Sequence, residues 1–318
     1  MINPLLDLKG DYYKYVFSEI DKLMKLGFKF PKNENSDVAK LSTYGNLLVR
    51  IPSNEPRKIY YANNFCCPDE YKEGLKQVES EIRNGKSLLR RLSTSILNAK
   101  YSDGMLFDFG ITHLHLGTKL SSKNRMFVER THKVLYCLLT NDSAYFITVD
   151  DHKHWADINL MKTLYSNFPE LIEKHQLNGL SLGKKITEEE RIAMRKGGII
   201  SFLQLDDKVF APVGGGITSA CTSLRGGNNI VRQLQFLESL EKEIINIIEM
   251  NSSRITAERG IYGTLELHFA TFSKPLIMFD KNLKYKFCIN WEWRDNESFN
   301  VTVHIDKVLF NNSIKKML

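Results

Sequence analysis

The chain has 318 residues, of which 44 are Lys or Arg and 37 are Asp or Glu, so its formal net charge is +7. It contains no apolar run of the roughly 20 residues that cross a bilayer, and its first residues lack the basic start and apolar core of a signal peptide. The five cysteines are odd in number and form no C-x-x-C pair, which favours reduced thiols over a disulfide scaffold. We therefore expect a cytoplasmic globular protein without a membrane partner.

The first half is expected to begin with helices and to continue with strands. Apolar residues recur at helical spacing up to Gly27, and two short strands are expected at 46–52 and 58–62. A helical region from Glu70 to about Asn98 can break at "RNGKS". The segments "ITHLHLG", "KVLYCLLT" and "AYFITVD" then predict three strands, and short connections between strands are typical of an antiparallel meander.

The second half is expected to contain a hairpin with a glycine loop, one long helix and four antiparallel strands. A helix or helix pair at 156–175, divided before Pro169, and a helix with the capping box Thr187–Glu190 precede the hairpin. Helices and strands are grouped rather than alternating, so the predicted class is α+β. We expect one domain at 1–185, which carries the His-x-His pairs, and an α+β domain of unknown role at 186–318.

Basic residues are concentrated in residues 83–133, where ten Lys or Arg face three acidic residues. A local excess of +7 favours a polyanionic partner such as RNA, because cations that neutralise phosphates release counterions; a solvated basic surface is the alternative. The expected nucleic-acid contacts are Arg83, Lys86, Arg90, Lys119, Lys123, Arg125 and Arg130.

Four of the eight histidines form two His-x-His pairs, His113 with His115 and His152 with His154. Residues at i and i+2 share one face of a strand. Three hypotheses remain open: acid–base catalysis of RNA cleavage without metal, with Lys153 among the cations; a zinc or manganese site with Asp150 or Asp151; and histidines that only stabilise a polar sheet edge.

The order of the elements between about Glu70 and Asp157 resembles the RelE/HigB-type toxin ribonucleases, which have a small barnase-like α+β fold. "DFGITHLHLG" stands where the first central strand of that family lies, and "KVLYCLLTNDSAYFITVDDHKHW" matches the hairpin that follows. The resemblance implies an RNA-cleaving site. It implies active-site roles for His113, His115, His152, Lys153 and His154, and phosphate contacts by Arg125 and Arg130.

Two further features have unremarkable interpretations. "APVGGGITSACTSLRGGNN" lacks the G-K-[ST] of a phosphate-binding loop and predicts a flexible or tightly turned loop. Trp291 and Trp293 share a strand face, which indicates core packing or a protein-contact patch.

The leading expectation is a metal-independent endoribonuclease of toxin or phage-defence type, which needs no cofactor. The alternatives are a non-enzymatic protein that binds a partner through its C-terminal half, and a metal-dependent nuclease or hydrolase.

Overall fold

The computed structural model describes every residue except 33–35, 153, 273, 282–283, 295–297 and 308–318. The chain forms two compact units. Residues 24–229 form one unit, here called the central unit, and residues 1–23 and 230–318 together form the other, here called the terminal unit. The expected boundary at 185/186 differs from this division, because the N-terminal residues pack with the C-terminal strands rather than with the residues that follow them.

The central unit combines helices with a four-stranded sheet. Its helices and strands are, in chain order, α2 (Asp37–Leu48), β2 (Lys58–Tyr61), α3 (Lys72–Arg83), α4 (Gly104–Phe109), β3 (Ile111–His115), β4 (Lys133–Leu139), β5 (Ser143–Asp151), α5 (Ile158–Asn167), α6 (Glu170–Glu173), α7 (Glu188–Lys196), β6 (Leu203–Leu205) and β7 (Lys208–Phe210). Short 3₁₀ turns lie at Asp69–Tyr71, Leu89–Arg91 and Thr94–Leu97.

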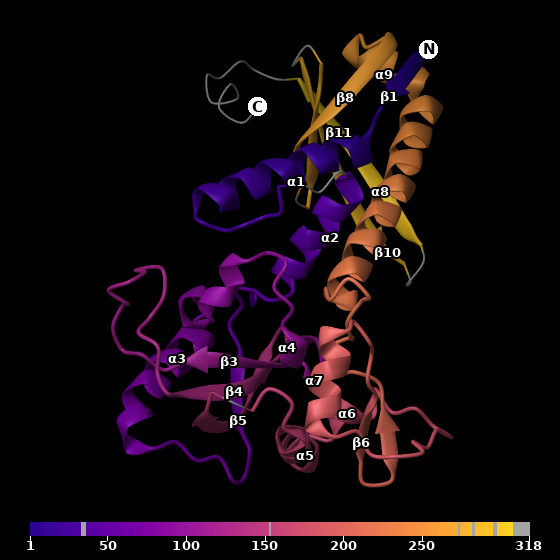
Figure 1. Cartoon of the computed structure of the whole chain (residues 1–318). Helices are drawn as coiled ribbons and strands as arrows, with labels where there is room; N and C mark the ends of the chain where they lie inside the picture. Colours follow the sequence, from indigo (N-terminus) through magenta and orange to yellow (C-terminus); the bar gives the residue numbers. More distant parts are fainter. Residues whose placement is uncertain (33–35, 153, 273, 282–283, 295–297, 308–318) are drawn as a thin grey trace. The chain divides into compact units, whose positions relative to one another are not determined.

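The four-stranded sheet has the order β2-β5-β4-β3, and β3, β4 and β5 lie side by side in Figure 1. The predicted antiparallel meander of β3, β4 and β5 is confirmed, and β2 adds to β5 in parallel. His113 lies opposite Tyr136 and His115 lies opposite Val134. The histidine-bearing strand β3 is therefore an edge strand of this sheet, although all five of its residues are buried.

The core on one face of this sheet ends at the histidines. Ile111 of β3 belongs to the same buried cluster as Val134 and Tyr136 of β4. Helix α5 contributes Leu160, Met161 and Leu164 to this cluster. Because residues at i, i+2 and i+4 share a strand face, His113 and His115 continue that face beyond Ile111. The apolar core gives way to two imidazoles at the C-terminal end of β3.

Two local predictions in the central unit were wrong. Residues 46–48, expected in a strand, belong to α2, whose N-cap Ser36 accepts a hydrogen bond from the Ala39 amide. The buried Leu41, Tyr44 and Leu47 of α2 recur at intervals of three residues, as on one face of a helix. The helix expected from Glu70 to about Asn98 ends at Arg83, and residues 89–97 form only 3₁₀ turns. Helix α4 was not predicted.

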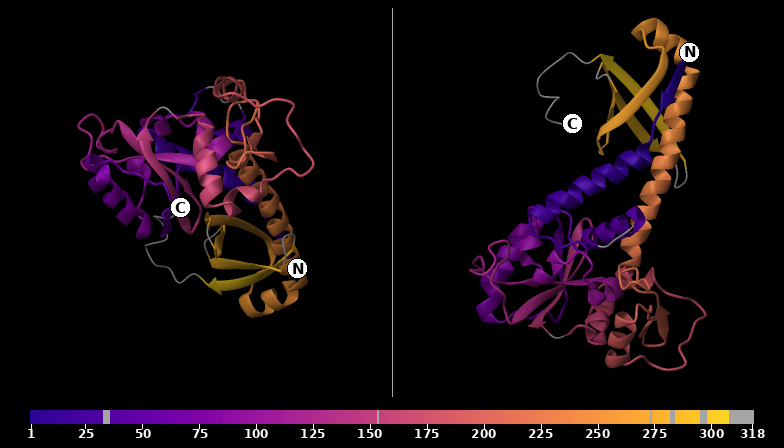
Figure 2. Two further views of the ribbon diagram at one scale, coloured as in Figure 1. Left: turned by 90° about the horizontal axis from the view of Figure 1, so that it is seen from below. Right: turned by 45° about the horizontal axis from the view of Figure 1, so that its top comes forward.

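The terminal unit is built on a five-stranded sheet of order β1-β8-β9-β10-β11, which the views in Figure 2 show in indigo and yellow. Its elements are β1 (Ile2–Leu5), α1 (Leu8–Lys25), α8 (Leu224–Met250), α9 (Ser252–Arg259), β8 (Gly263–Thr271), β9 (Leu276–Asp280), β10 (Tyr285–Trp293) and β11 (Phe299–Lys307). Residues 24–25 at the end of α1 and 224–229 at the start of α8 belong to the central unit. The four C-terminal strands were predicted, whereas β1 and α9 were not.

An aromatic group lies on the sheet of the terminal unit. The ring of Phe236 lies 5.3 Å from that of Trp291 and 5.6 Å from that of Trp293, and Phe299 joins them. Trp293 is 54% exposed, so this tryptophan is not a core residue.

Among the helices that the structure describes, none has both the length and the apolar character that crossing a membrane would need.

Candidate functional site

Three of the four paired histidines converge. The ring of His152 lies 4.8 Å from that of His113 and 5.2 Å from that of His115, and the rings of His113 and His115 are 5.9 Å apart. One ring nitrogen from each residue lies within 4.8 Å of the corresponding nitrogens of the other two. We call these three residues the histidine trio. Two of them come from β3 and the third follows the end of β5, about 40 residues later.

The ring nitrogens of the trio lack hydrogen-bond partners among the described residues. Both nitrogens of His113, both of His115 and Nε2 of His152 are buried without a partner. His113 is 7% exposed and His115 is 2% exposed, so bulk water does not replace the missing partners. Because a buried polar group without a partner costs free energy of about 1–3 kcal/mol, five such atoms on three adjoining rings indicate a binding site rather than an ordinary core.

Burial keeps the trio neutral. Burial is the largest of the causes that lower the pKa of His113 to about 3, and the charges of His152, His115 and Arg130 are the others. Burial, Arg130 and His152 likewise lower the pKa of His115 to about 3. The pKa of His152 is also lowered, mainly by burial. At neutral pH the imidazoles therefore have free lone pairs, which is the state in which histidine binds a metal ion.

The C-terminal end of β3 is anchored by a buried arginine. Arg91, 1% exposed, forms a two-bond ion pair with Glu81 of α3, with both nitrogen–oxygen distances 2.8 Å. Its Nη1 donates to the carbonyl oxygens of Gly117, at 2.6 Å, and His115. The Arg91 guanidinium thus ties α3 to the strand end that carries His115. Sequence inspection counted Arg91 as part of the basic surface, but it is an internal cation.

The segment that carries His152 is anchored from both sides. The Tyr136 hydroxyl donates to the carbonyl of Asp151 at 2.7 Å, directly before His152. Beyond it, Arg195 of α7 donates from Nη1 to the carbonyl of Trp155. The Trp155 ring lies 4.8 Å from that of His152 and 5.2 Å from that of His113, edge to face. These contacts hold the His152 ring over the β3 pair.

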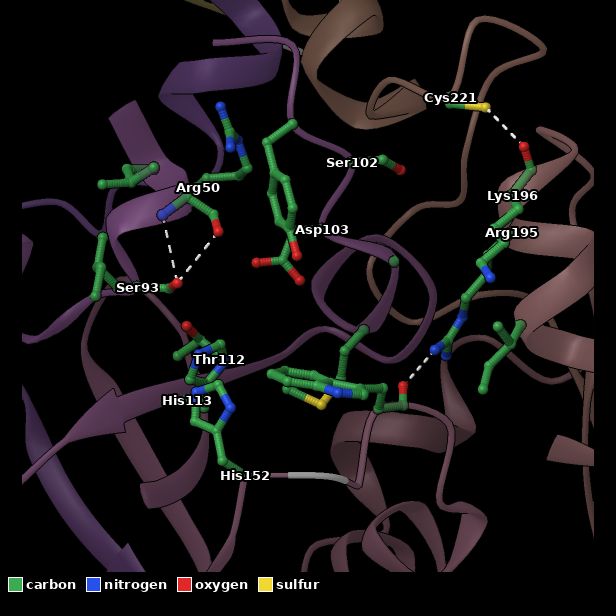
Figure 3. Close-up of a pocket in the computed structure, with 18 of the residues that line it drawn as sticks. Arg50, Ser93, Ser102, Asp103, Thr112, His113, His152, Arg195, Lys196 and Cys221 are labelled. Atoms are coloured by element: carbon green, nitrogen blue, oxygen red, sulfur yellow. Dashed lines mark hydrogen bonds between the residues drawn. The ribbon is translucent and has the colours of Figure 1, made fainter. Parts of the chain in front are cut away.

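Two members of the trio border a cavity of about 670 Å³ in the central unit, here called the histidine cavity. His113 and His152 project into it, and Arg50, Asp103 and Arg195 line other parts of its wall (Figure 3). The remaining polar or charged lining residues are Ser93, Ser95, Tyr101, Ser102, Thr112, Arg130, Trp155, Lys196 and Cys221. A cavity of this size with cations around it accommodates an anionic organic ligand.

His154 does not join the trio. Strand β5 ends at Asp151, so the expected alternation of His152 and His154 on one strand face fails. The Nδ1 atom of His154 lies 3.0 Å from Asp157, and its Nε2 lies 3.5 Å from Asp150. Lys153 falls outside the described residues. Asp150 and Asp151 bind Lys133, at 3.0 and 2.9 Å, and do not join the trio as ligands.

The seven predicted nucleic-acid contacts are all exposed, and only one of them lines the histidine cavity. That residue is Arg130, whose charge also acts on His113, His115 and His152. The others are Arg83, Lys86, Arg90, Lys119, Lys123 and Arg125.

Sequence inspection missed a buried charge cluster behind the site. Asp108 of α4 accepts bonds from Arg191 and Arg195 of α7, each with an ion-pair distance of 2.9 Å, and from Ser201 at 3.2 Å. All four side chains are buried. Because Arg195 also holds the Trp155 carbonyl, α7 is fixed against the segment that carries His152. The sequence holds a weak signal for this cluster, namely two arginines four residues apart on a capped helix.

Of the two loop forms expected at the glycine cluster, the structure has a tight turn: Gly215 and Gly216 have φ angles of 95° and 93°, and the Gly215 amide donates to the Pro212 carbonyl at 3.0 Å. A Cβ atom at Gly214 would lie 1.9 Å from the carbonyl oxygen of Leu106. Gly226 lies inside α8, and a Cβ there would lie 2.7 Å from the carbonyl oxygen of Gly45. These glycines permit α4 and α2 to approach the backbone that follows β7.

No family model, curated protein or solved structure matches the chain. The geometry of the site therefore carries the functional argument.

The trio matches the ligand set of a catalytic zinc site. Such sites use three protein ligands and leave a fourth position open, and three imidazoles are one established set. Bonds of about 2.0 Å in a tetrahedron separate ligand atoms by about 3.3 Å, so modest ring rotations bring the trio nitrogens together. The histidine cavity adjoins His113 and His152, so an open position there would face it.

Proposed function

We propose that the histidine trio binds a divalent ion of the zinc type and that the protein hydrolyses phosphate esters in the histidine cavity, with nucleic acid as substrate. The observation that carries the proposal is the group of five buried ring nitrogens without partners. Neutral imidazoles suit zinc and neighbouring transition metals. The cations along the cavity suit a phosphate group.

The trio would hold such an ion, which would polarise a phosphoryl oxygen and activate water. In the proposed hydrolysis, water would add to phosphorus, the bond from phosphorus to the leaving oxygen would break, and the proton released by water would end on that oxygen. Arg130 is placed to neutralise the phosphate, as it lines the cavity beside the trio. Asp103 is the one carboxyl group among the lining residues, and burial raises its pKa, so it is the candidate for proton exchange.

The metal-independent ribonuclease is the second candidate, and the geometry supports it less well. Acid–base cleavage of RNA needs one neutral and one protonated imidazole at working pH. Burial lowers the pKa of His113 and of His115 to about 3, and their ring nitrogens have no carboxylate partner that would favour protonation. The resemblance to toxin ribonucleases supports RNA as the substrate of either mechanism.

The first experiment measures metal content and turnover together. Chelator-treated protein is titrated with Zn²⁺ and Mn²⁺ by calorimetry, and hydrolysis of bis(p-nitrophenyl) phosphate and of a labelled RNA is followed with each ion. We expect one ion per chain and hydrolysis that stops in excess chelator. The double variant His113→Asn/His115→Asn should lose ion binding and hydrolysis. Its affinity for the ion should fall at least about 100-fold, because two of the three protein ligands are removed.

The matched control is His132→Asn, since His132 is an exposed histidine outside the trio. This variant should bind the metal ion and hydrolyse both substrates as the unaltered chain does. Equal ion uptake by the double variant and the unaltered chain would refute the metal site. RNA cleavage that persists in chelator and disappears in the double variant would replace the metal mechanism by the acid–base one.

A further inference from the structure

Strand β11 forms one edge of the five-stranded sheet in the terminal unit. It is nine residues long and pairs with β10 along its whole length without a shift in register. It contains no proline. The strand at the other edge, β1, is only four residues long and includes Pro4. Because short edge strands and prolines hinder pairing between sheets, β1 is a protected edge and β11 is not.

The outer side of β11 presents backbone donors and acceptors that pair with no other strand in the described part of the chain. The Arg294 amide donates to the Ser298 carbonyl at 3.0 Å, so these two residues form a hydrogen-bonded pair. Such pairs alternate with non-hydrogen-bonded pairs along an antiparallel ladder. In the register of the two strands, the even-numbered residues of β11 therefore bond to β10. The amides and carbonyls of residues 299, 301, 303, 305 and 307 point away from it.

The two faces of β11 differ in their side chains. One face is apolar and half-buried, with Phe299, Val301, Val303 and Ile305. The Phe299 ring lies 5.4 Å from that of Phe236 of α8, so this face continues the core of the unit. The other face is polar and exposed, with Asn300, Thr302, His304 and Asp306. A strand added at this edge would cover the half-buried apolar side chains.

The apolar face of β11 is complementary to itself in the antiparallel direction. When Val303 of two copies lies on a twofold axis, the two Val303 side chains face each other. Val301 of each copy then faces Ile305 of the other, so apolar side chains meet apolar side chains across the strands. In this register the outward amides and carbonyls of both strands also meet.

The polar face matches in the same register. Asn300 lies opposite Asp306 of the second copy, and Thr302 lies opposite His304. These are non-hydrogen-bonded pairs, in which opposing side chains lie closest. The Asn300 oxygen already accepts a bond from the Arg294 guanidinium, so its amide nitrogen is the group that can donate to the Asp306 carboxylate. Within residues 299–307, this register sets no two like charges opposite each other.

We infer that β11 is an interface between two copies of this chain, which pair these strands antiparallel across a twofold axis at Val303. Twofold contacts use the same surface on both partners, so a self-complementary strand satisfies both copies at once. A strand of another protein would meet the backbone requirement alone, whereas the side chains on both faces match an identical strand. The inference does not depend on the hydrolase proposed above.

The first measurement is the oligomeric state of the full chain, by sedimentation equilibrium over a series of concentrations. We expect a monomer–dimer equilibrium whose limiting mass is twice the 36.7 kDa of one chain. A mass that stays at that of one chain at every concentration would overturn the inference.

Charge substitutions at two exposed positions test the register. Thr302→Lys/His304→Lys sets lysine opposite lysine on both sides of the axis, and Thr302→Glu/His304→Glu does the same with glutamate. Each variant should raise the Kd of the dimer at least about tenfold, because like charges directly opposite each other on paired strands are destabilising. An equal mixture of the two variants should associate again, since every lysine then faces a glutamate.

The matched control is Gln235→Lys/Ser239→Lys, which makes a comparable change at two exposed residues of α8 in the same unit. It should dimerise as the unaltered chain does, and melting temperatures check that every variant is folded. Two outcomes would overturn the paired β11 strands: dimerisation of the lysine and glutamate variants alone as strong as that of the control, or a mixture that associates no better than its components.

Discussion

At the scale of single residues, the same side chain has opposite roles in different surroundings. His152 is drawn into the trio, whereas His154, two residues later, lies between the carboxylates of Asp150 and Asp157. Arg91 and Arg90 are neighbours in a basic run, yet Arg91 is buried in an ion pair and Arg90 is exposed. Burial and partners, not residue type, decide which histidine is free to bind a ligand.

The lowered pKa values of His113 and His115 predict a pH-dependent stability of the metal-free protein. An unfolded histidine has a pKa near 6.5, so between pH 6.5 and about 3 the unfolded chain binds more protons than the folded one. The stabilisation is complete above pH 6.5 and is lost as the pH falls toward 3. For each unit by which the pH falls within this range, each of the two histidines should lower the free energy of unfolding by up to about 1.4 kcal/mol.

Urea unfolding of chelator-treated protein at intervals from pH 7.5 to 5 measures this slope. The slope should be smaller in His113→Asn/His115→Asn and unaltered in His132→Asn. An identical slope in the double variant and the unaltered chain would show that other groups cause the acid sensitivity.

At the scale of elements, the capped helix α7 and the edge strand β3 position the site. The capping box predicted for α7 is confirmed. The Thr187 hydroxyl accepts a hydrogen bond from the Glu190 backbone amide, and the Glu190 carboxylate accepts one from the Thr187 backbone amide. The helix presents Arg191 and Arg195 to Asp108, directly before β3. Charge pairing in the core thus joins two elements that are far apart along the chain.

Removing Asp108 should therefore be costly. Asp108→Ala leaves two buried guanidinium groups without their carboxylate, and breaking a buried pair in this way typically costs about 3–5 kcal/mol. Denaturant unfolding at pH 7 measures the loss, with the exposed Asp207→Ala as control. A loss for Asp108→Ala as small as that of the control would mean that the cluster is hydrated and energetically neutral.

At the scale of the whole molecule, the chain builds two units with separate cores. The core of the central unit lies around Tyr136 and Phe109. In the terminal unit, β1 pairs in parallel with β8, and the Ile2 amide donates to the Ser252 hydroxyl at 2.6 Å. The histidine trio and the histidine cavity both lie in the central unit.

A lesion in the terminal unit should therefore leave the metal site intact. Ile2 is 3% exposed, so Ile2→Asp buries a charge without a partner and should destabilise this unit by several kcal/mol. Asn3→Asp, on the exposed side of the same strand, is the control. We expect more rapid proteolysis of the terminal residues in Ile2→Asp, with unchanged zinc affinity. A parallel loss of zinc affinity would show that the two units unfold together.

The amino-acid sequence by itself determined the elements whose pattern repeats within a few residues: helix α1, the meander of β3, β4 and β5, the α7 cap and the four C-terminal strands. It also placed His113 and His115 on one strand face, because alternation of side chains is a local property. Only the tertiary structure decided which distant residues meet. His152 reaches the β3 pair because β5 ends at Asp151, and Asp108, Arg191 and Arg195 come together through packing between elements that share no sequence period. Local periodicity acts over a few bonds, whereas a binding site depends on strand order, register and helix docking across a hundred residues or more.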